Sequence, residues 1–400
     1  MYLLDKNRCL AWFYKRVNFC GFFKERALPD MHILVFPIDM DKVTDFISTV
    51  KSLGIKLTGA SSVMSKAEGY NIDYYHKLPF VTEDTFEEQF DELISNRSIT
   101  HVYTPHGGVW MYLFKLKKLK PTKFSFILCE PSPYVEDWIK FKPSYDWAEM
   151  ILKERFVEFF IGCKDDARKK LLLGQYASLH KQFTNITGQC DVLKLLALVH
   201  ISRLIPEGDL VEIGSFSGRS AFGIAWLAQK YRIGSLVCID PWSHEKIEDQ
   251  GEQSKILNSK LVEGGDLIDF DKIFSSYIGA VSLLDNVGFI RDISENAVTS
   301  YIEASQKGVL INTELGEVDI SGEIAMLHID GNHRYDYVCK DIEAWEPLVK
   351  PGGWVLLDDY VWAFGDGPKK AGDELLHSGK FDFGFTMSDT LFLRKKMQDV

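Results

Sequence analysis

Three aspartates and a histidine follow two apolar, strand-like runs near the C-terminus. One run ends in Asp330, with His333 three residues later, and the next run ends in Asp358 and Asp359. In an open α/β sheet, ligands bind beyond the carboxyl ends of the strands. Carboxylates suit a hard divalent cation and histidine suits a general base, so we expect a catalytic site here. The alternative is a solvated strand end with a surface histidine, the commoner arrangement for paired acids.

The elements that position these groups are expected to belong to a two-domain protein, because 400 residues exceed what one hydrophobic core usually serves. The net charge of −11 argues against nucleic acid or an anionic membrane as partner and favours a small-molecule acceptor. The seven cysteines show no CxxC or Cys/His spacing, which indicates a reducing, cytoplasmic setting without a zinc site. A homo-oligomer stays open as an alternative to a monomer.

Residues 1–30 are predicted to be a leader that packs on the following domain. Its apolar stretches are too short and too interrupted by charges for a signal peptide, and we expect no membrane span.

Residues 31–133 alternate strand-like and helix-like segments. The apolar run Ile33–Pro37 is typical of a buried parallel strand, and residues 41–53 show helical periodicity closed by Gly54. Further strands are expected at residues 57–60, 100–105 and 124–129, with a helix at 86–95. The alternation predicts a small doubly wound α/β domain.

The stretch from His32 to about Gly108 resembles the N-terminal subdomain that precedes the catalytic body in ATP-grasp enzymes (the preATP-grasp subdomain). The matching pieces are Val35-Phe36-Pro37, Gly59-Ala60-Ser61-Ser62, Leu78-Pro79-Phe80-Val81 and Thr104-Pro105-His106. No ATP-grasp body follows, so we expect this domain to bind substrate or a partner. Residues 134–186, with aromatic and charged residues at helical spacing, are predicted to form a helical linker.

A second alternation of strands and helices fills residues 187–400. Parallel strands are expected at Leu210–Gly214, Leu236–Asp240, Val287–Ile290, Ala325–Asp330 and Trp354–Asp358. Residues 381–387 and 390–394 flank a turn like a terminal antiparallel hairpin. Between the third and fourth strands, residues 308–322 predict either a hairpin or a lid over the acceptor. The fold class is therefore α/β, with a Rossmann-like sheet and a terminal hairpin.

A glycine-containing turn follows the first of these strands. Missing side chains at Gly214 and Gly218 would let a ligand approach the backbone and a helix N-terminus. Asp240 ends the next strand, where a carboxylate can accept hydrogen bonds from both ribose hydroxyls of an adenosine cofactor. A nicotinamide dinucleotide would want a third glycine, but Phe222 occupies that region. S-adenosylmethionine, which has no pyrophosphate, needs it less.

Residues 187–394 resemble the class I S-adenosylmethionine-dependent methyltransferases. The glycine turn, Asp240, Arg291-Asp292-Ile293-Ser294 and Pro351-Gly352-Gly353 occur in the order the family uses. The resemblance implies S-adenosylmethionine as cofactor, with its methionine end at Glu212 and Gly214, its ribose at Asp240, and its adenine edge at Asp292 or Ser294. Gly188-Gln189 would close over it. The cofactor-binding residues expected on this basis are Gln189, Glu212, Gly214, Ser215, Gly218, Ser220, Asp240, Asp292, Ser294 and Asp330.

Within that superfamily, Asp330-Gly331-Asn332-His333 with Asp358-Asp359 resembles the metal-dependent sugar O-methyltransferases of antibiotic tailoring. The resemblance implies Mg²⁺ held by Asp330, Asp358 and Asp359, His333 as general base, and a sugar or nucleotide-sugar acceptor. A sugar hydroxyl is weakly acidic, and coordination by a cation lowers its pKa. The alternatives are a metal-independent methyltransferase for a small amine or carboxylate, a non-catalytic cofactor-binding module, and an NAD-dependent oxidoreductase.

Overall fold

The computed structural model describes residues 30–63, 69–155, 167–243, 269–361 and 365–397. The chain divides into two compact units, residues 1–143 and 144–400, so the boundary lies within the segment predicted as a helical linker. The predicted leader lies outside the described residues except for Asp30. Within the described ranges, no helix is long and apolar enough to cross a membrane.

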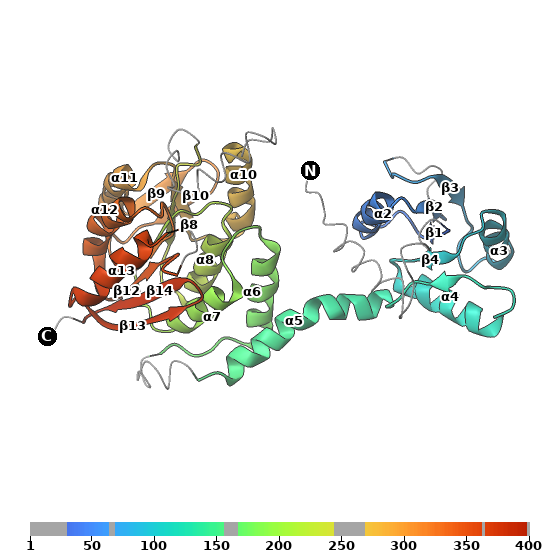
Figure 1. Ribbon diagram of the computed structural model, residues 1–400, viewed down its shortest axis with the longest axis horizontal. Helices are drawn as coiled ribbons and strands as arrows, with labels where there is room; N and C mark the ends of the chain where they lie inside the picture. Colours follow the sequence, from blue (N-terminus) through green and yellow to red (C-terminus); the bar gives the residue numbers. More distant parts are fainter. Residues whose placement is uncertain (1–29, 64–68, 156–166, 244–268, 362–364, 398–400) are drawn as a thin grey trace. The chain divides into compact units, whose positions relative to one another are not determined.

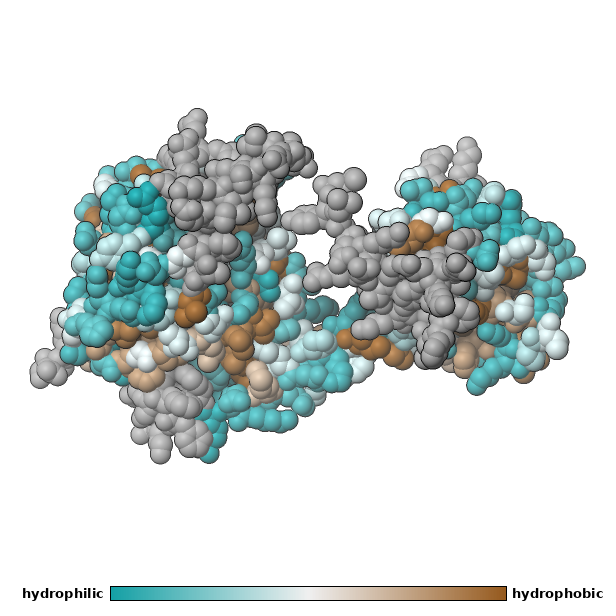
Figure 2. Space-filling view, viewed as in Figure 1, coloured by the Kyte–Doolittle hydropathy of each residue, from teal (hydrophilic) through white to brown (hydrophobic). Residues whose placement is uncertain are grey.

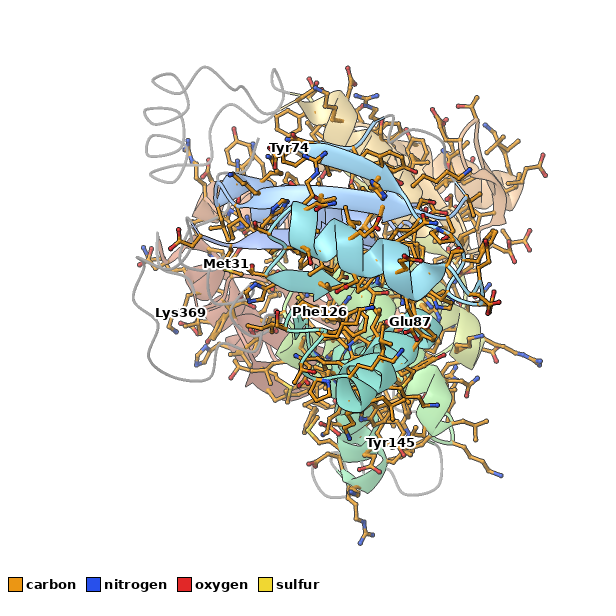
Figure 3. The ribbon with its side chains drawn as sticks, turned by 90° about the vertical axis from the view of Figure 1, so that its right-hand side faces the viewer. Met31, Tyr74, Glu87, Phe126, Tyr145 and Lys369 are labelled. Carbon is orange, nitrogen blue, oxygen red and sulfur yellow. The ribbon has the colours of Figure 1, made fainter. Side chains whose placement is uncertain are left out.

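The N-terminal unit is built on a parallel sheet with the strand order β3-β2-β1-β4-β5 (Figure 1). Its strands are β1 (His32–Val35), β2 (Lys56–Ser61), β3 (Tyr74–Lys77), β4 (His101–Tyr103) and β5 (Ile127–Leu128). Its helices are α2 (Val43–Ser52), α3 (Phe86–Asn96) and α4 (Gly107–Leu119). Tyr74 on β3 and Phe126, just before β5, mark the two edges of the sheet in Figure 3.

Both faces of this sheet are covered by helices, because side chains alternate along a strand. Ile33 and Val35 belong to a hydrophobic cluster with residues of α2, whereas Leu34 belongs to a second cluster with residues of α3 and α4. Every residue of β1 is buried, as its continuous apolar run predicts. The predicted doubly wound α/β domain is confirmed.

Two helices lie in the segment predicted as a linker. They are α5 (Pro133–Lys153) and α6 (Leu173–Asn185). The aromatic residues of α6 are buried, and Tyr176 Oη hydrogen-bonds Tyr231 Oη at 3.0 Å in the C-terminal unit. We therefore count α6 with the core of that unit, where aromatic side chains at helical spacing serve packing.

The C-terminal unit is built on a larger sheet with the strand order β13-β14-β12-β11-β6-β7-β8. Its strands are β6 (Asp209–Ile213), β7 (Leu236–Ile239), β8 (Val287–Ile290), β11 (Ile324–Ile329), β12 (Val349–Leu357), β13 (Phe381–Met387) and β14 (Thr390–Lys395). The helices around it are α7 (Val192–Ile201), α8 (Arg219–Tyr231), α10 (Phe270–Val281), α11 (Ser294–Lys307), α12 (Tyr335–Trp345) with the short 3-10 helix η4 (Glu346–Leu348), and α13 (Gly367–His377). β6, β7, β8, β11 and β12 run parallel, and β14 pairs antiparallel with both β12 and β13, as predicted.

The order of this sheet reverses at β6. The strands β7 and β8 extend from one side of β6, and β11 and β12 extend from the other. Such a reversal opens a crevice at the carboxyl ends of the two central strands. The residues predicted to do chemistry follow β6, β7, β11 and β12, so the topology brings them to one edge of the sheet.

Residues 308–322 form a hairpin of β9 (Val309–Asn312) and β10 (Gly316–Asp319). Asn312 fixes it to the edge strand β8, because its side chain accepts from the Phe289 N–H at 2.9 Å and donates to the Phe289 carbonyl at 2.9 Å. Of the two predicted arrangements, the hairpin is correct and the lid over the acceptor is wrong. The apolar side of the hairpin packs against the sheet edge and thereby protects it.

Hydrophobic residues lie mainly inside the two units. On the face drawn in Figure 2, hydrophilic residues cover most of the described surface, with hydrophobic residues in small patches. Hydrophobic burial therefore accounts for the stability of each sheet, and the polar groups that are buried need a separate reason.

Candidate active site

The turn after β6 has the backbone that its glycines predict. Gly214 and Gly218 both have φ of 85°, in the left-handed region that favours glycine. A Cβ atom on Gly214 would lie 2.0 Å from the backbone oxygen of Asp330. The glycine thus lets the turn after β6 touch the end of β11, which brings the two central strands together at the site.

We expect Gly214→Ala to lower the free energy of unfolding by about 2 kcal/mol or more, because the methyl group meets backbone at a positive φ. Gly279→Ala is the matched control, since nothing lies within 4 Å of a Cβ on this residue of α10. In the control, stability should stay level or rise by up to about 1 kcal/mol. Urea unfolding followed by tryptophan fluorescence measures both. Equal stability of the two variants would show that the turn relaxes away from Asp330.

A cavity of about 740 Å³ lies at this edge of the sheet, within the size range of small-molecule sites. Most of the predicted site residues line it: Gln189, Gly214, Ser215, Ser220, Asp240, Asp292, Ser294, Asp330, His333, Asp358 and Asp359. Acidic side chains far outnumber basic ones on its wall. The cavity therefore favours a ligand or ion that carries positive charge.

Glu212 was expected at the cavity wall, but it is fully buried beneath it. It accepts a hydrogen bond from Ser215 Oγ at 2.7 Å, and its Oε1 lies 3.0 Å from His328 Nδ1. Glu212 and His328 are directly opposite each other in the register of β6 and β11. The carboxylate thus has internal partners that account for its burial. Gly218, likewise predicted to bind cofactor, is packed against Tyr277 of α10 instead of lining the cavity.

Asp240 follows β7 and shapes two turns. Its Oδ2 accepts the backbone N–H of Phe216 at 2.9 Å, and its Oδ1 accepts the backbone N–H of Trp242 at 2.8 Å. Burial raises the pKa of Asp240, and these two hydrogen bonds oppose the shift. The backbone of Ser215 donates a third hydrogen bond. A carboxylate has about four acceptor positions, so Asp240 can still accept a hydroxyl group in the cavity.

The Gly188-Gln189 segment is held at the mouth of the turn by Arg219. Its guanidinium donates to the Gly188 carbonyl at 3.1 Å and lies 4.7 Å from the ring of Phe183. Arg219 also lines the cavity. It directly follows the glycine turn in sequence, but nothing in its local pattern indicated this contact.

Two more cavity residues lie where α11 begins: Ser294 is its first residue, and Asp292 precedes its N-cap. Asp292 Oδ1 accepts the Ile293 N–H at 2.8 Å, and Ser294 Oγ accepts the indole N–H of Trp345 at 2.9 Å. Beside them lies Asp341 of α12, a cavity residue that the sequence did not single out. Burial raises the pKa of Asp341 to about 7, against a hydrogen bond from Ser294.

The predicted acid group is assembled at the ends of β11 and β12. Ligand atoms of Asp330, His333 and Asp359 lie within 4.8 Å of one another, and those of His328, Asp330 and Asp358 form an overlapping group. His333 Nε2 is 2.5 Å from Asp359 Oδ2. The structure therefore brings His333 next to Asp359 and separates Asp358 into the deeper group.

Lys194 of α7 is part of the acid group, although the sequence did not predict it as a site residue. It is 1% exposed, and its Nζ pairs with Asp358 Oδ2 and lies 3.6 Å from Asp330 Oδ2. Burial works against its charge, but the Asp358 and Asp330 carboxylates raise the pKa of Lys194 well above its usual value. The signal was a single lysine within the apolar run from Val192 to Ile201.

The pKa values of the carboxyl groups in this cluster shift in opposite directions. Burial and the neighbouring Asp358 raise the pKa of Asp330 well above its usual value. Burial works against ionisation of Asp358, but Lys194 holds its pKa well below the usual value. Asp389, from the turn between β13 and β14, also lines the cavity, and burial together with Asp358 raises its pKa. Such divergent pKa values within one cleft are typical of catalytic sites.

Part of the C-terminal unit is similar to a known family of domains. Residues 211–360 match the family model described as a methyltransferase domain. The uncharacterised protein R132 of Acanthamoeba polyphaga mimivirus is 25% identical over 197 residues, which cover 49% of this chain and 71% of that protein.

Solved structures with low sequence identity are also found. The O-methyltransferase NovP is 16% identical, with a TM-score of 0.35, and the match covers 63% of this chain and 99% of NovP. CalS11, a TDP-rhamnose 3'-O-methyltransferase of calicheamicin biosynthesis, is 16% identical, with a TM-score of 0.33 over 66% of this chain and 96% of CalS11. TM-scores this low decide nothing about chemistry. The similarity to a methyltransferase domain therefore rests on two findings. One is the family match over residues 211–360, and the other is the strand order of the large sheet with its terminal antiparallel hairpin.

Proposed function

We propose that the methyltransferase domain in residues 211–360 methylates a hydroxyl oxygen of a sugar or nucleotide-sugar, with S-adenosylmethionine as donor and Mg²⁺ as a second cofactor. One observation carries the proposal: Asp330, His333 and Asp359 place their ligand atoms within 4.8 Å of one another on the wall of the cavity. A base next to two carboxylates suits removal of a proton from an oxygen beside a cation.

The cavity wall fits the donor. The glycine turn exposes backbone at the N-terminus of α8, and Asp240 keeps an acceptor position for a ribose hydroxyl. Asp292 and Ser294 line the cavity where α11 begins, and they would contact the adenine edge. The excess of acidic side chains suits the positive sulfonium.

The donor set also fits a hard divalent cation. Asp330 and Asp359 both line the cavity and offer carboxylate oxygens close together, so these residues would hold Mg²⁺. When bound, the ion would lower the pKa of the acceptor hydroxyl and orient its oxygen. Asp358, the third ligand predicted from the sequence, is paired with Lys194.

His333 would act as the general base. With Nε2 facing Asp359, the other ring nitrogen, Nδ1, would take the hydroxyl proton while the acceptor oxygen bonds to the methyl carbon and the carbon–sulfur bond breaks, releasing S-adenosylhomocysteine. Asp359, 2.5 Å from Nε2, would orient the ring and stabilise the imidazolium that results.

One observation favours a second candidate, a metal-independent methyltransferase. The ammonium of Lys194 already supplies a positive charge beside Asp330 and Asp358. In that case an amine or carboxylate acceptor, which needs no cation to react, would be the natural substrate. Activity in the presence of a chelator separates the two candidates.

We expect Asp240→Asn to weaken binding of S-adenosylhomocysteine by about 1.5 to 3 kcal/mol, the range for hydrogen bonds to a charged group. Calorimetric titration measures the affinity. The control is the 2',3'-dideoxyribose analogue, which should bind both proteins with equal affinity because it lacks the hydroxyls that Asp240 would accept. If the variant loses affinity for the analogue to the same degree, Asp240 supports the turn and does not bind ribose.

A further inference from the structure

Lys194 carries its charge at a position where a helix disfavours it. Asp191 is the N-cap of α7, so Lys194 is the third residue of the helix. The N-terminus of a helix has a partial positive charge, which repels a cation in its first turn. Burial to 1% exposure adds a desolvation cost. The carboxylates around its ammonium must offset both effects.

Hydrogen bonds from both the backbone and the ammonium hold Lys194 in place. The backbone N–H of Lys194 donates to Asp191 Oδ1 at 2.8 Å, and Asp191 Oδ2 accepts from Ser388 Oγ at 2.7 Å. At the end of the side chain, Lys194 Nζ donates to Asp358 Oδ2. Lys194 thus ties α7 to the end of β12, and the turn before β14 holds α7 in place.

Both oxygens of Asp358 already have strong donors. Lys194 Nζ donates to Oδ2, and the hydroxyl of Thr390 donates to Oδ1. The Asp358 side chain is only 10% exposed, against 24% for Asp330 and 18% for Asp359. Asp358 also lines the cavity, but it is the least exposed of the three carboxylates, and both of its oxygens are held by side chains of the protein.

We propose that Lys194 is a positioning residue that holds Asp358 away from the metal ion, leaving Asp330 and Asp359 as the carboxylate ligands beside His333. The inference rests on the proposed function, because it assigns parts within the same site. Of the three predicted ligands, Asp330 and Asp359 bind the cation, and Asp358 binds the ammonium of Lys194. The ammonium neutralises the third carboxylate, which limits how tightly the site holds the ion.

The test is calorimetric titration of Mg²⁺ into the full chain saturated with S-adenosylhomocysteine. Lys194→Met should raise the affinity about tenfold or more, because it frees Asp358 and removes a positive charge. The double variant Lys194→Met with Asp358→Asn should return to within about threefold of the original chain, since its net charge is restored and both ligands remain. Asp359→Asn should lose more than about 100-fold, beyond the usual effect of residues that only support a ligand.

Lys340→Met is the matched control. Lys340 also lines the cavity, but it pairs with Glu295 at 3.6 Å and lies outside the acid group. Its loss should change the Mg²⁺ affinity by less than about threefold, because a charge paired elsewhere is largely screened. If the Mg²⁺ affinity of Lys340→Met rose as much as that of Lys194→Met, the change in net charge alone would explain both variants. That result would overturn the role assigned to Lys194.

Two further outcomes would overturn the inference. A loss in the double variant as large as that of Asp359→Asn would make Asp358 a metal ligand. Unchanged or weaker binding in a folded Lys194→Met variant would make Lys194 merely structural. Thermal unfolding without metal checks folding, and if the single variant unfolds, the double variant decides, because removing both partners of a buried ion pair is well tolerated.

The original chain separates this inference from the proposed function. If it binds Mg²⁺ and Lys194→Met leaves the affinity unchanged, the role of Lys194 is wrong and the proposed metal site stands. If neither binds Mg²⁺, both are wrong.

Discussion

EDTA should abolish methyl transfer and leave the affinity for S-adenosylhomocysteine within about twofold. The expected loss is large because a sugar hydroxyl is a poor nucleophile at neutral pH without a cation to lower its pKa, a contribution of several kcal/mol. Cofactor affinity should survive because the residues placed near the adenosine moiety, Asp240, Asp292 and Ser294, lie outside the acid group. Methyl transfer is measured from labelled S-adenosylmethionine, and binding by calorimetry.

Restoring excess Mg²⁺ is the first control, since recovery of the rate excludes damage by the chelator. Asp359→Asn is the second, because it should reproduce the loss without any chelator. Its charge-matched partner is Asp382→Asn, on the surface strand β13, where Asp382 pairs with Arg394 at 2.8 Å. Full activity in EDTA would contradict the metal-assisted function and favour the metal-independent candidate.

His333→Ala should slow methyl transfer by about 10² to 10⁴-fold, the usual contribution of a general base. The loss should appear in kcat, because His333 acts on the proton and not on the donor. Raising the pH should restore part of the rate, since more of the acceptor then ionises without a base. The measurement is a pH–rate profile of the variant beside that of the original chain.

His377→Ala is the matched control for this prediction, because His377 is an exposed residue of α13 outside the cavity. Its profile should overlay the original one. If the profile of His333→Ala keeps its shape and only shifts downward by a small factor, another residue takes the proton and His333 supports Asp359.

The sequence predicted the sheet well because its signals are local. Largely apolar runs predicted β6, β7, β11 and β12, and the polar pair Ser388-Asp389 predicted the turn of the terminal hairpin. Since the carboxyl ends of parallel strands meet at one edge, Asp240, Asp330 and Asp359 could be placed near one another before any distance was known.

The sequence could not predict which polar groups face inward. Glu212 and His328 are far apart in the chain and become partners only through the register of β6 and β11. Lys194 and Asp358 become partners only when α7 packs beneath the ends of the strands. The free energy of burying such groups depends on the partner, and no local pattern specifies a partner across the fold.

Synthesis of the chain sets an order for assembly of the acid group. Asp358 receives its hydrogen bond from Thr390, the first residue of β14, and Asp191 receives one from Ser388 in the preceding turn. Because β14 follows every other strand that the structure describes, a nascent chain acquires α7, β6 and the glycine turn long before it acquires these donors. Domains fold from the N-terminal end during translation, so the N-terminal unit can form while the acid group is still incomplete. Prematurely ended chains that lack β14 would therefore retain the glycine turn but leave Lys194 and Asp358 without the element that closes over them.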